Sequence, residues 1–281
     1  MLVTLGLFSC TEDIDVKLHS GETRLSVEAN VNSDFKKHIV KLKETSDVFY
    51  SQDAITVNNA VVSVSDGTSD FKYIEKEPGI YESEIEFAGQ AGKTYSLSIK
   101  NVDINKDGNM EEYLASSTMR QAYVIDSIKM HFDPEYESND NDEDKGEFWL
   151  LSIYTKDDID SEDYYAFASR VNDVLVHDTI TEVLVEKDTY FNGKETKGVD
   201  VSEFNQLKED EILHNMDKIT LETYAINKGY YDFVSQLQLM DEESSMFSGP
   251  PGNIKTNISN GAIGFFSVYS ITRTNIIHKS N

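Results

Sequence analysis

The sequence predicts a mainly β protein built as two β-sandwich domains in series, and three observations support this. Long segments alternate apolar or β-branched residues with polar ones, which is the period-two pattern of half-buried strands. Tyrosine (15) and phenylalanine (14) are abundant whereas proline (4) is scarce. The chain has 281 residues, which is enough for two domains that each bury their own core.

The first predicted domain covers residues 24–120 and consists of short strands. Residues 25–31 alternate with period two, and turn pairs such as Asp66-Gly67 and Pro78-Gly79 separate the strands that follow. Short strands at such close spacing indicate an immunoglobulin-like or transthyretin-like sandwich. The expected strands are residues 25–31, 38–45, 60–65, 71–75, 81–87, 94–99 and 113–119.

The second predicted domain covers residues 121–281 and contains one helix, at residues 227–240. Apolar residues recur there at i, i+3, i+4 and i+7, so they form one face of an amphipathic helix that packs against a sheet. These residues are Tyr230, Phe233, Val234 and Leu237. Further on, Gly261 and Gly264 bracket the start of a final strand, where we expect no room for a side chain. The domain would begin near residues 124–128, and the expected strands are residues 148–154, 164–171, 173–178, 218–224 and 264–271.

The balance of charge argues against one class of partner. The chain has 51 acidic and 25 basic residues, which gives a formal net charge of -26. Such a charge repels phosphate backbones and anionic lipid head groups. We therefore expect no nucleic-acid binding.

The single cysteine, Cys10, is the most informative residue near the N-terminus. It follows a short apolar run at residues 2–8 and the small residue Ser9. Leu7-Phe8-Ser9-Cys10 resembles a bacterial lipobox, in which a signal peptide (residues 1–9) is removed and the cysteine thiol takes a diacylglycerol. No Lys or Arg precedes the run, so we expect the signal to be truncated at its start. The alternative is a buried N-terminal strand that ends in a free cysteine.

Lipidation of Cys10 would make residues 10–23 a tether to a membrane. No other stretch approaches the 18 or so apolar residues of a spanning helix, so two acyl chains would hold the mature protein at the lipid bilayer. Acidic residues at positions 12, 13 and 15 directly follow Cys10. This arrangement is similar to the surface-export signal of Bacteroidota lipoproteins, which implies an outer-membrane location facing the cell exterior.

Residues 103–108 form the most specific local motif. Oxygen-bearing side chains alternate there before Gly108, as in the first half of a calcium loop. Position twelve of such a loop is Leu114 instead of a bidentate Glu. The calcium ligands would be Asp103, Asn105 and Asp107, with Glu111 and Glu112 closing the site. The alternative is a polar hairpin rich in turn residues. Calcium is thus a candidate ligand, and no cofactor is required.

Catalytic patterns are missing from the sequence. It contains no Gly-x-Ser-x-Gly elbow, no glycine-rich phosphate loop and no histidines at metal-ligand spacing. Carboxylates are so numerous that a pair of them is not diagnostic of glycoside chemistry. We therefore expect a non-enzymatic protein without catalytic residues, and a hydrolase with an unrecognised acidic site is the less favoured alternative.

Several aromatic and apolar residues lie beside turns, where an exposed patch could contact a partner protein or stack on a sugar ring. The candidate partner-binding residues are Tyr190, Phe191, Tyr230, Tyr231, Phe247, Pro250 and Pro251. The alternative is that these side chains fill the seam between the domains.

The C-terminal third carries a family resemblance. Its segments Gly229-Tyr-Tyr-Asp-Phe233, residues 247–253 and residues 257–270 are similar, in this order, to the closing part of Bacteroidota outer-membrane lipoproteins catalogued as domain of unknown function 4249. The resemblance extends forward through Asp163-Tyr-Tyr165 and residues 91–95 to Cys10. It implies a lipoprotein without established catalytic residues, whose gene often lies beside that of a TonB-dependent transporter.

Together these observations predict an accessory or binding subunit of a TonB-dependent outer-membrane transporter in nutrient uptake. That transporter and the lipid bilayer would be its partners. The alternative is a surface protein that binds a glycan or a peptide without a transporter.

Overall fold

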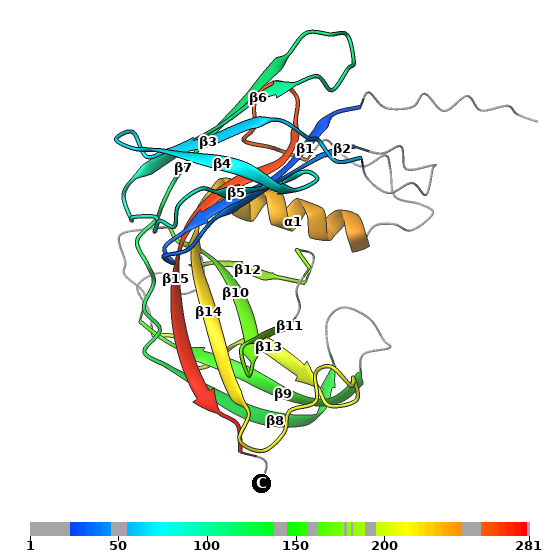
Figure 1. Cartoon of the computed structure of the whole chain (residues 1–281). Helices are drawn as coiled ribbons and strands as arrows, with labels where there is room; N and C mark the ends of the chain where they lie inside the picture. Colours follow the sequence, from blue (N-terminus) through cyan, green and yellow to red (C-terminus); the bar gives the residue numbers. More distant parts are fainter. Residues whose placement is uncertain are drawn as a thin grey trace, which may run out of the picture.

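The computed structural model describes residues 23–45, 55–137, 145–156, 162–176, 179–180, 182–188, 195–242 and 254–279. This part of the chain is mainly β, with one packed helix, as predicted (Figure 1). The elements are β1 (Leu25–Asn32), β2 (Ile39–Glu44), β3 (Val61–Ser65), β4 (Asp70–Glu77), β5 (Ile80–Ser83), β6 (Thr94–Val102), β7 (Glu111–Thr118), β8 (Ser127–Glu137), β9 (Lys145–Tyr154), β10 (Tyr164–Val171), β11 (Val174–Val176), β12 (Leu184–Lys187), β13 (Val199–Asn205), β14 (Lys218–Ile226), α1 (Lys228–Glu242) and β15 (Ile263–Ile277).

A single long sheet runs through both halves of the chain. Its strand order is β11-β10-β14-β15-β1-β2-β5-β4-β3-β6-β7, and β12 pairs with β10 at one side. The N-terminal strands alternate buried and exposed residues along their length, as in β7 and β1. Their buried side chains form the first core, which includes Val31, Leu42, Tyr81 and Ile99.

Strand β15 belongs to both halves of the molecule. Its first half pairs in parallel with β1 (Ser26 with Ile263 through Asn32 with Tyr269), and its second half pairs antiparallel with β14 (Ala225 with Ser270 through Lys218 with Ile277). Ala262, Phe266 and Val268 consequently lie in the core of the N-terminal half. The predicted boundary near residue 120 stays a prediction, but the sheet continues across it.

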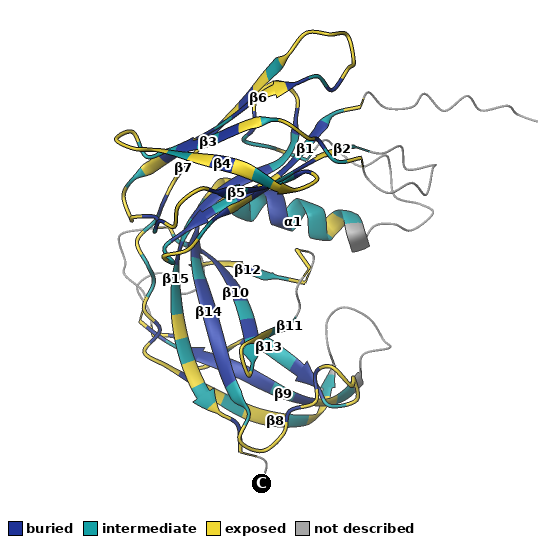
Figure 2. Cartoon of the chain, viewed as in Figure 1, coloured by how far each residue is buried: buried dark blue, intermediate teal, exposed yellow. Residues whose placement is uncertain are grey.

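Two further layers cover the C-terminal part of the sheet. A second sheet of order β13-β9-β8 packs against one face, where Leu151, Phe204 and Leu221 share a core. Helix α1 packs on the opposite face, where Phe233 and Val234 contact a cluster that includes Ile226 and Phe265. Figure 2 shows that β14, between these layers, is buried along most of its length.

Side chains fix the connection between the two halves. The Ser270 hydroxyl donates to the backbone oxygen of Arg120 at 2.6 Å. The Asn227 side chain caps α1 by accepting from the Tyr230 N–H at 2.9 Å, and its amide nitrogen donates to the Ser117 hydroxyl at 2.8 Å. The helix is therefore attached to the last strand of the N-terminal half, β7, at its first turn.

The structure confirms most of the predicted elements and adds three. The helix predicted at residues 227–240 is α1, and predicted strands 164–171 and 218–224 are β10 and β14. Strands β8, β12 and β13 were not predicted. Of the predicted tether at residues 10–23, Cys10 and everything up to residue 22 lie outside the described residues, as do residues 177–178 of a predicted strand. In the described part, no helix has the length and apolar character that crossing a membrane requires. The immunoglobulin-like or transthyretin-like subclass stays a prediction.

Gly264 is required for the parallel pairing of β1 with β15, and the predicted lack of room for a side chain is confirmed there but not at Gly261. The φ of Gly264 is +99°, and a Cβ atom there would lie 1.9 Å from the backbone oxygen of Val27. Gly261 also has a positive φ, +72°, but no atom lies within 4 Å of the position of its Cβ. At Gly264 a side chain is disfavoured both by the close contact with Val27 and by the positive φ. At Gly261 only the positive φ disfavours one.

We expect Gly264→Ala to reduce the free energy of unfolding by about 3 kcal/mol or more, because backbone must move to admit the methyl group. The matched control, Gly261→Ala, adds only the strain of a left-handed residue, about 1–2 kcal/mol. Urea unfolding followed by circular dichroism measures both. Equal losses in the two variants would contradict the close contact at Val27.

Candidate functional site

The predicted calcium loop is a turn in which the candidate side chains bond to the backbone. Asp103 accepts hydrogen bonds from the N–H groups of Asp107 and Gly108 at 3.1 and 3.0 Å, and Asn105 accepts a second bond from Asp107 N at 3.0 Å. Asp107 in turn accepts from the N–H of Asn109 at 2.7 Å, which lowers the pKa of Asp107. These oxygens thus stabilise the turn.

The two glutamates expected to close the calcium site point to other partners. Glu111 accepts from the Tyr113 hydroxyl at 2.5 Å, and Glu112 pairs with Lys100 at 3.0 Å across β6 and β7. Among the described residues, no three His, Cys, Asp or Glu side chains are placed to hold a metal ion. Calcium binding stays a prediction.

The candidate partner-binding aromatics that the structure describes, Tyr230 and Tyr231, pack against the core. The Tyr230 ring lies 5.5 Å from the Phe265 ring, and the Tyr231 ring lies 5.2 Å from the Tyr164 ring. Both residues belong to the layer between α1 and the sheet, within the C-terminal half and not at a seam between the predicted domains. A partner-binding role for them stays a prediction. Residues 190, 191, 247, 250 and 251 lie outside the described residues.

One place in the described chain brings a serine, a histidine and an aspartate together. Ser152 on β9 donates to Asp200 on β13 at 2.6 Å, and its oxygen lies 3.3 Å from Nδ1 of His131 on β8. A catalytic triad instead has the serine donating to the histidine and the histidine to the carboxylate. Here the serine proton is given to the carboxylate, so the arrangement does not activate Ser152 as a nucleophile.

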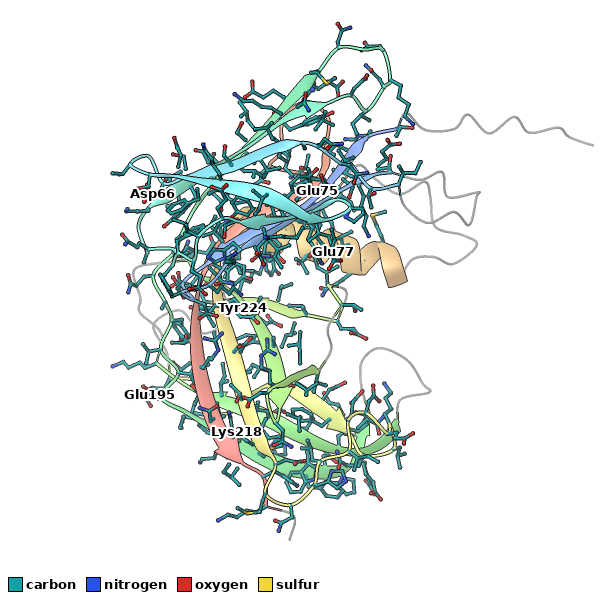
Figure 3. The ribbon with its side chains drawn as sticks, viewed as in Figure 1. Asp66, Glu75, Glu77, Glu195, Lys218 and Tyr224 are labelled. Atoms are coloured by element: carbon teal, nitrogen blue, oxygen red, sulfur yellow. The ribbon has the colours of Figure 1, made fainter. Side chains whose placement is uncertain are left out.

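A polar depression lies on the long sheet, on the same face as α1. Alternate residues of β14 share one face, so Lys218, Thr220 and Glu222 point to the same side as Tyr224, which packs in the α1 layer. Figure 3 labels Lys218 and Tyr224, which bracket this stretch of β14. The depression has a volume of about 410 Å³ and is lined by Arg170, Asp173, Lys218, Thr220, Glu222, Arg273 and Asn275. We refer to it as the Glu222 depression.

Glu222 is the centre of the depression and is only 4% exposed. Its Oε1 atom lies 2.7 Å from Nε of Arg273 on β15 and 3.2 Å from Nε of Arg170 on β10. The Tyr224 hydroxyl donates to Oε2 at 2.6 Å. A buried carboxylate with three donors from three adjacent strands fixes the orientation of both guanidinium groups.

The remaining charges lie around this centre. The terminal nitrogens of Arg273 bond to the two carboxylate oxygens of Asp34 at 2.8 and 2.7 Å, so β15 is also linked to the turn after β1. Lys218 pairs with Asp173 at 2.7 Å. Nη1 of Arg170 donates to the backbone oxygen of Asp173 at 3.2 Å.

The pKa shifts in the depression keep the carboxylates charged and the Tyr224 hydroxyl neutral. Burial raises the pKa of Glu222, but the hydrogen bonds from Tyr224, Arg273 and Arg170 outweigh it and leave the pKa below its ordinary value. Burial, with the neighbouring Glu222, raises the pKa of Tyr224. Bonding to Arg273 lowers the pKa of Asp34. At neutral pH Glu222 is therefore an anion and Tyr224 a neutral donor.

Sequence reasoning missed the Glu222 depression. A signal was present, because Glu222 is the one charged residue in the run Ile219–Ile226, whose other residues are apolar, hydroxyl-bearing or aromatic. Its partners, however, come from strands about 50 residues away on either side. Only the pairing of β14 with β10 and β15 brings them together.

Fold and site together define a protein of two β-sheets and one packed helix, with a charged depression that is open to solvent on the longer sheet. The chain belongs to the family described as Domain of unknown function (DUF4249), whose model matches residues 11–275. No curated protein matches the chain.

We expect Glu222→Gln to lower the free energy of unfolding by about 3 kcal/mol at pH 7, because it leaves two oriented guanidinium groups without their buried partner. The control Glu112→Gln breaks an exposed pair with Lys100 and should cost less than about 1 kcal/mol. Urea unfolding at several pH values measures both variants.

The pH dependence follows from the lowered pKa of Glu222. Its stabilising contribution is present above pH 4.5, the ordinary value, and is lost as the pH falls through the pKa of the folded state. The stability of the parent protein should therefore approach that of Glu222→Gln below pH 4.5. A gap that does not shrink on acidification would contradict the assignment.

Proposed function

We propose that the chain is a non-enzymatic lipoprotein of the outer-membrane surface that binds a solute and docks as an accessory subunit on a TonB-dependent transporter. The observation that carries the binding role is the Glu222 depression. It presents charged donors in fixed orientations on a rigid sheet, as a recognition site requires.

The chemistry of the depression favours binding over hydrolysis. A general acid needs a carboxyl group whose pKa is raised toward neutral pH. Glu222, the buried carboxylate of this site, has a lowered pKa and is paired with two arginines. Ser152 donates to an aspartate, so it does not supply a nucleophile either.

The membrane address rests on the sequence around Cys10. A lipid on Cys10 would keep the start of β1, at Leu25, within about 50 Å of the bilayer, since an extended chain spans at most about 3.5 Å per residue. This range suits a body that rests on the outer face of a neighbouring membrane protein. The TonB-dependent transporter follows from the family resemblance in the sequence.

An affinity pull-down tests the partner. The native lipoprotein, tagged at Asn281, is purified from detergent-solubilised outer membranes, and co-purifying proteins are identified by mass spectrometry. We expect a TonB-dependent transporter in about stoichiometric amount. A lipoprotein that is recovered alone under mild conditions would contradict docking and favour the alternative, a surface protein that binds a glycan or peptide by itself.

Substitution of the anchor tests the location. Cys10→Ser removes the thiol that would be acylated, so we expect the protein to leave the membrane fraction. Ser9→Ala keeps a small residue before the cysteine and should remain in that fraction. Fractionation with immunoblotting measures both, and membrane association of Cys10→Ser equal to that of the parent would refute lipid anchoring.

A further inference from the structure

We propose that the Glu222 depression binds the carboxylate group of a small solute through Arg170, Lys218 and Asn275. This inference rests on the proposed binding function and names the chemical class of the ligand and the residues that contact it. The three side chains come from the adjacent strands β10, β14 and β15.

The three proposed donors lie on the exposed rim of the depression. The Arg170 and Lys218 side chains are 33% and 43% exposed, whereas Glu222 beneath them is 4% exposed. Glu222 holds Arg170 through Nε, and Asp173 O accepts from Nη1. In the described part of the chain this leaves Nη2 of Arg170 for a ligand oxygen.

Asn275 completes the set. Its Oδ1 atom accepts a hydrogen bond from the Thr220 hydroxyl at 2.6 Å. Because the oxygen of the amide is used in this way, the orientation of the side chain is fixed and its nitrogen remains as the donor. The register places Asn275 opposite Thr220, one step along the same face from Arg273 and Glu222.

The protein itself shows how a carboxylate lies on this rim. Asp173, in the turn after β10, places its Oδ1 atom 2.7 Å from Nζ of Lys218, with its side chain 76% exposed. An exposed ion pair of this kind contributes about 1 kcal/mol or less. An incoming carboxylate that also contacts Arg170 and Asn275 can therefore replace Asp173 as the partner of Lys218, and Asp173 acts as an internal competitor.

A singly charged carboxylate fits better than a doubly charged phosphate. The chain has a formal net charge of -26, so repulsion grows with the charge of the ligand. Within the depression, Glu222 pairs with both Arg170 and Arg273. Asp34 pairs with Arg273, and Asp173 pairs with Lys218. The three cations are thus matched by three carboxylates, so a ligand carboxylate that replaces Asp173 keeps the balance, whereas a second negative charge on the ligand would exceed it. A planar guanidinium group also matches the two oxygens of a carboxylate.

Isothermal titration calorimetry on the full-length lipoprotein in detergent tests this site with four probes: butyrate, trialanine, trialanine amidated at its C-terminus, and inorganic phosphate. We expect trialanine to bind and its amide not to bind, and binding to weaken as salt is raised. Butyrate is a simple monocarboxylate, so comparing it with trialanine distinguishes a free organic acid from a peptide C-terminus as the source of the carboxylate. Binding of the amide equal to that of trialanine, no binding of either carboxylate probe, or binding of inorganic phosphate alone would overturn the proposal.

Two variants should change the affinity in opposite directions. Lys218→Gln removes one charged donor and should weaken binding about tenfold. Asp173→Asn removes the competing carboxylate and should strengthen binding several-fold. Asparagine tolerates the left-handed conformation at this position, where φ is +69°, so this variant is expected to fold.

Lys100→Gln is the matched control, because Lys100 also forms an exposed cross-strand pair but lies on β6, away from the depression. Its affinity should equal that of the parent. Equal losses in Lys100→Gln and Lys218→Gln, or no gain in Asp173→Asn, would contradict the assignment. A titration that detects no binding contradicts the carboxylate site but says nothing about docking, which the pull-down tests on its own. The two proposals can therefore be refuted independently.

Discussion

The parallel pairing of β1 with β15 is the constraint on which the rest of the structure depends. Strands at the two ends of the described chain meet there, and Gly264 is the residue that lets the Val27 backbone approach. Because the same strand continues as the partner of β14, the two cores cannot be separated without breaking β15. The order of the whole sheet follows from this one pair.

The charged site is a consequence of that pairing. Arg273 reaches Glu222 because β15 lies beside β14, and it reaches Asp34 because β15 also lies beside β1, whose following turn carries this aspartate. One guanidinium group thus links the two halves on the face that α1 leaves open. Removing charged groups from water is costly unless each charge keeps its partner. The partners in this network stay in place only if the strands that carry them do not move relative to one another. In this protein β15 supplies that rigidity.

Strands and the helix could be predicted from the sequence where apolar residues recur with a regular period. Leu25–Asn32 alternates strictly and α1 has a clear apolar face, so both were predicted close to their observed bounds. Strand β13 was missed because a register shift between Asp200 and Ser202 interrupts its period of two. Strand β12 has four residues, Leu184–Lys187, and only its first two are apolar, so the segment does not alternate.

The pairing of strands and the site could not be predicted in the same way. Hydrophobic alternation specifies which face of a strand is buried but not which distant strand lies beside it. Arg170, Glu222 and Arg273 meet only once β10, β14 and β15 are adjacent. The calcium motif shows the opposite case: its residues were found by spacing, and the structure uses their oxygens to stabilise a turn.

Native-state hydrogen exchange tests most directly whether β15 makes the two halves one cooperative unit. The comparison is between amides of β1, such as Val27 and Ala29, and amides of β14, such as Leu221 and Thr223, at increasing concentrations of denaturant. We predict that both sets exchange through the same global opening, with equal free energies. Exchange of β1 at a lower free energy, while β14 stays protected, would contradict the coupling of the two halves through β15.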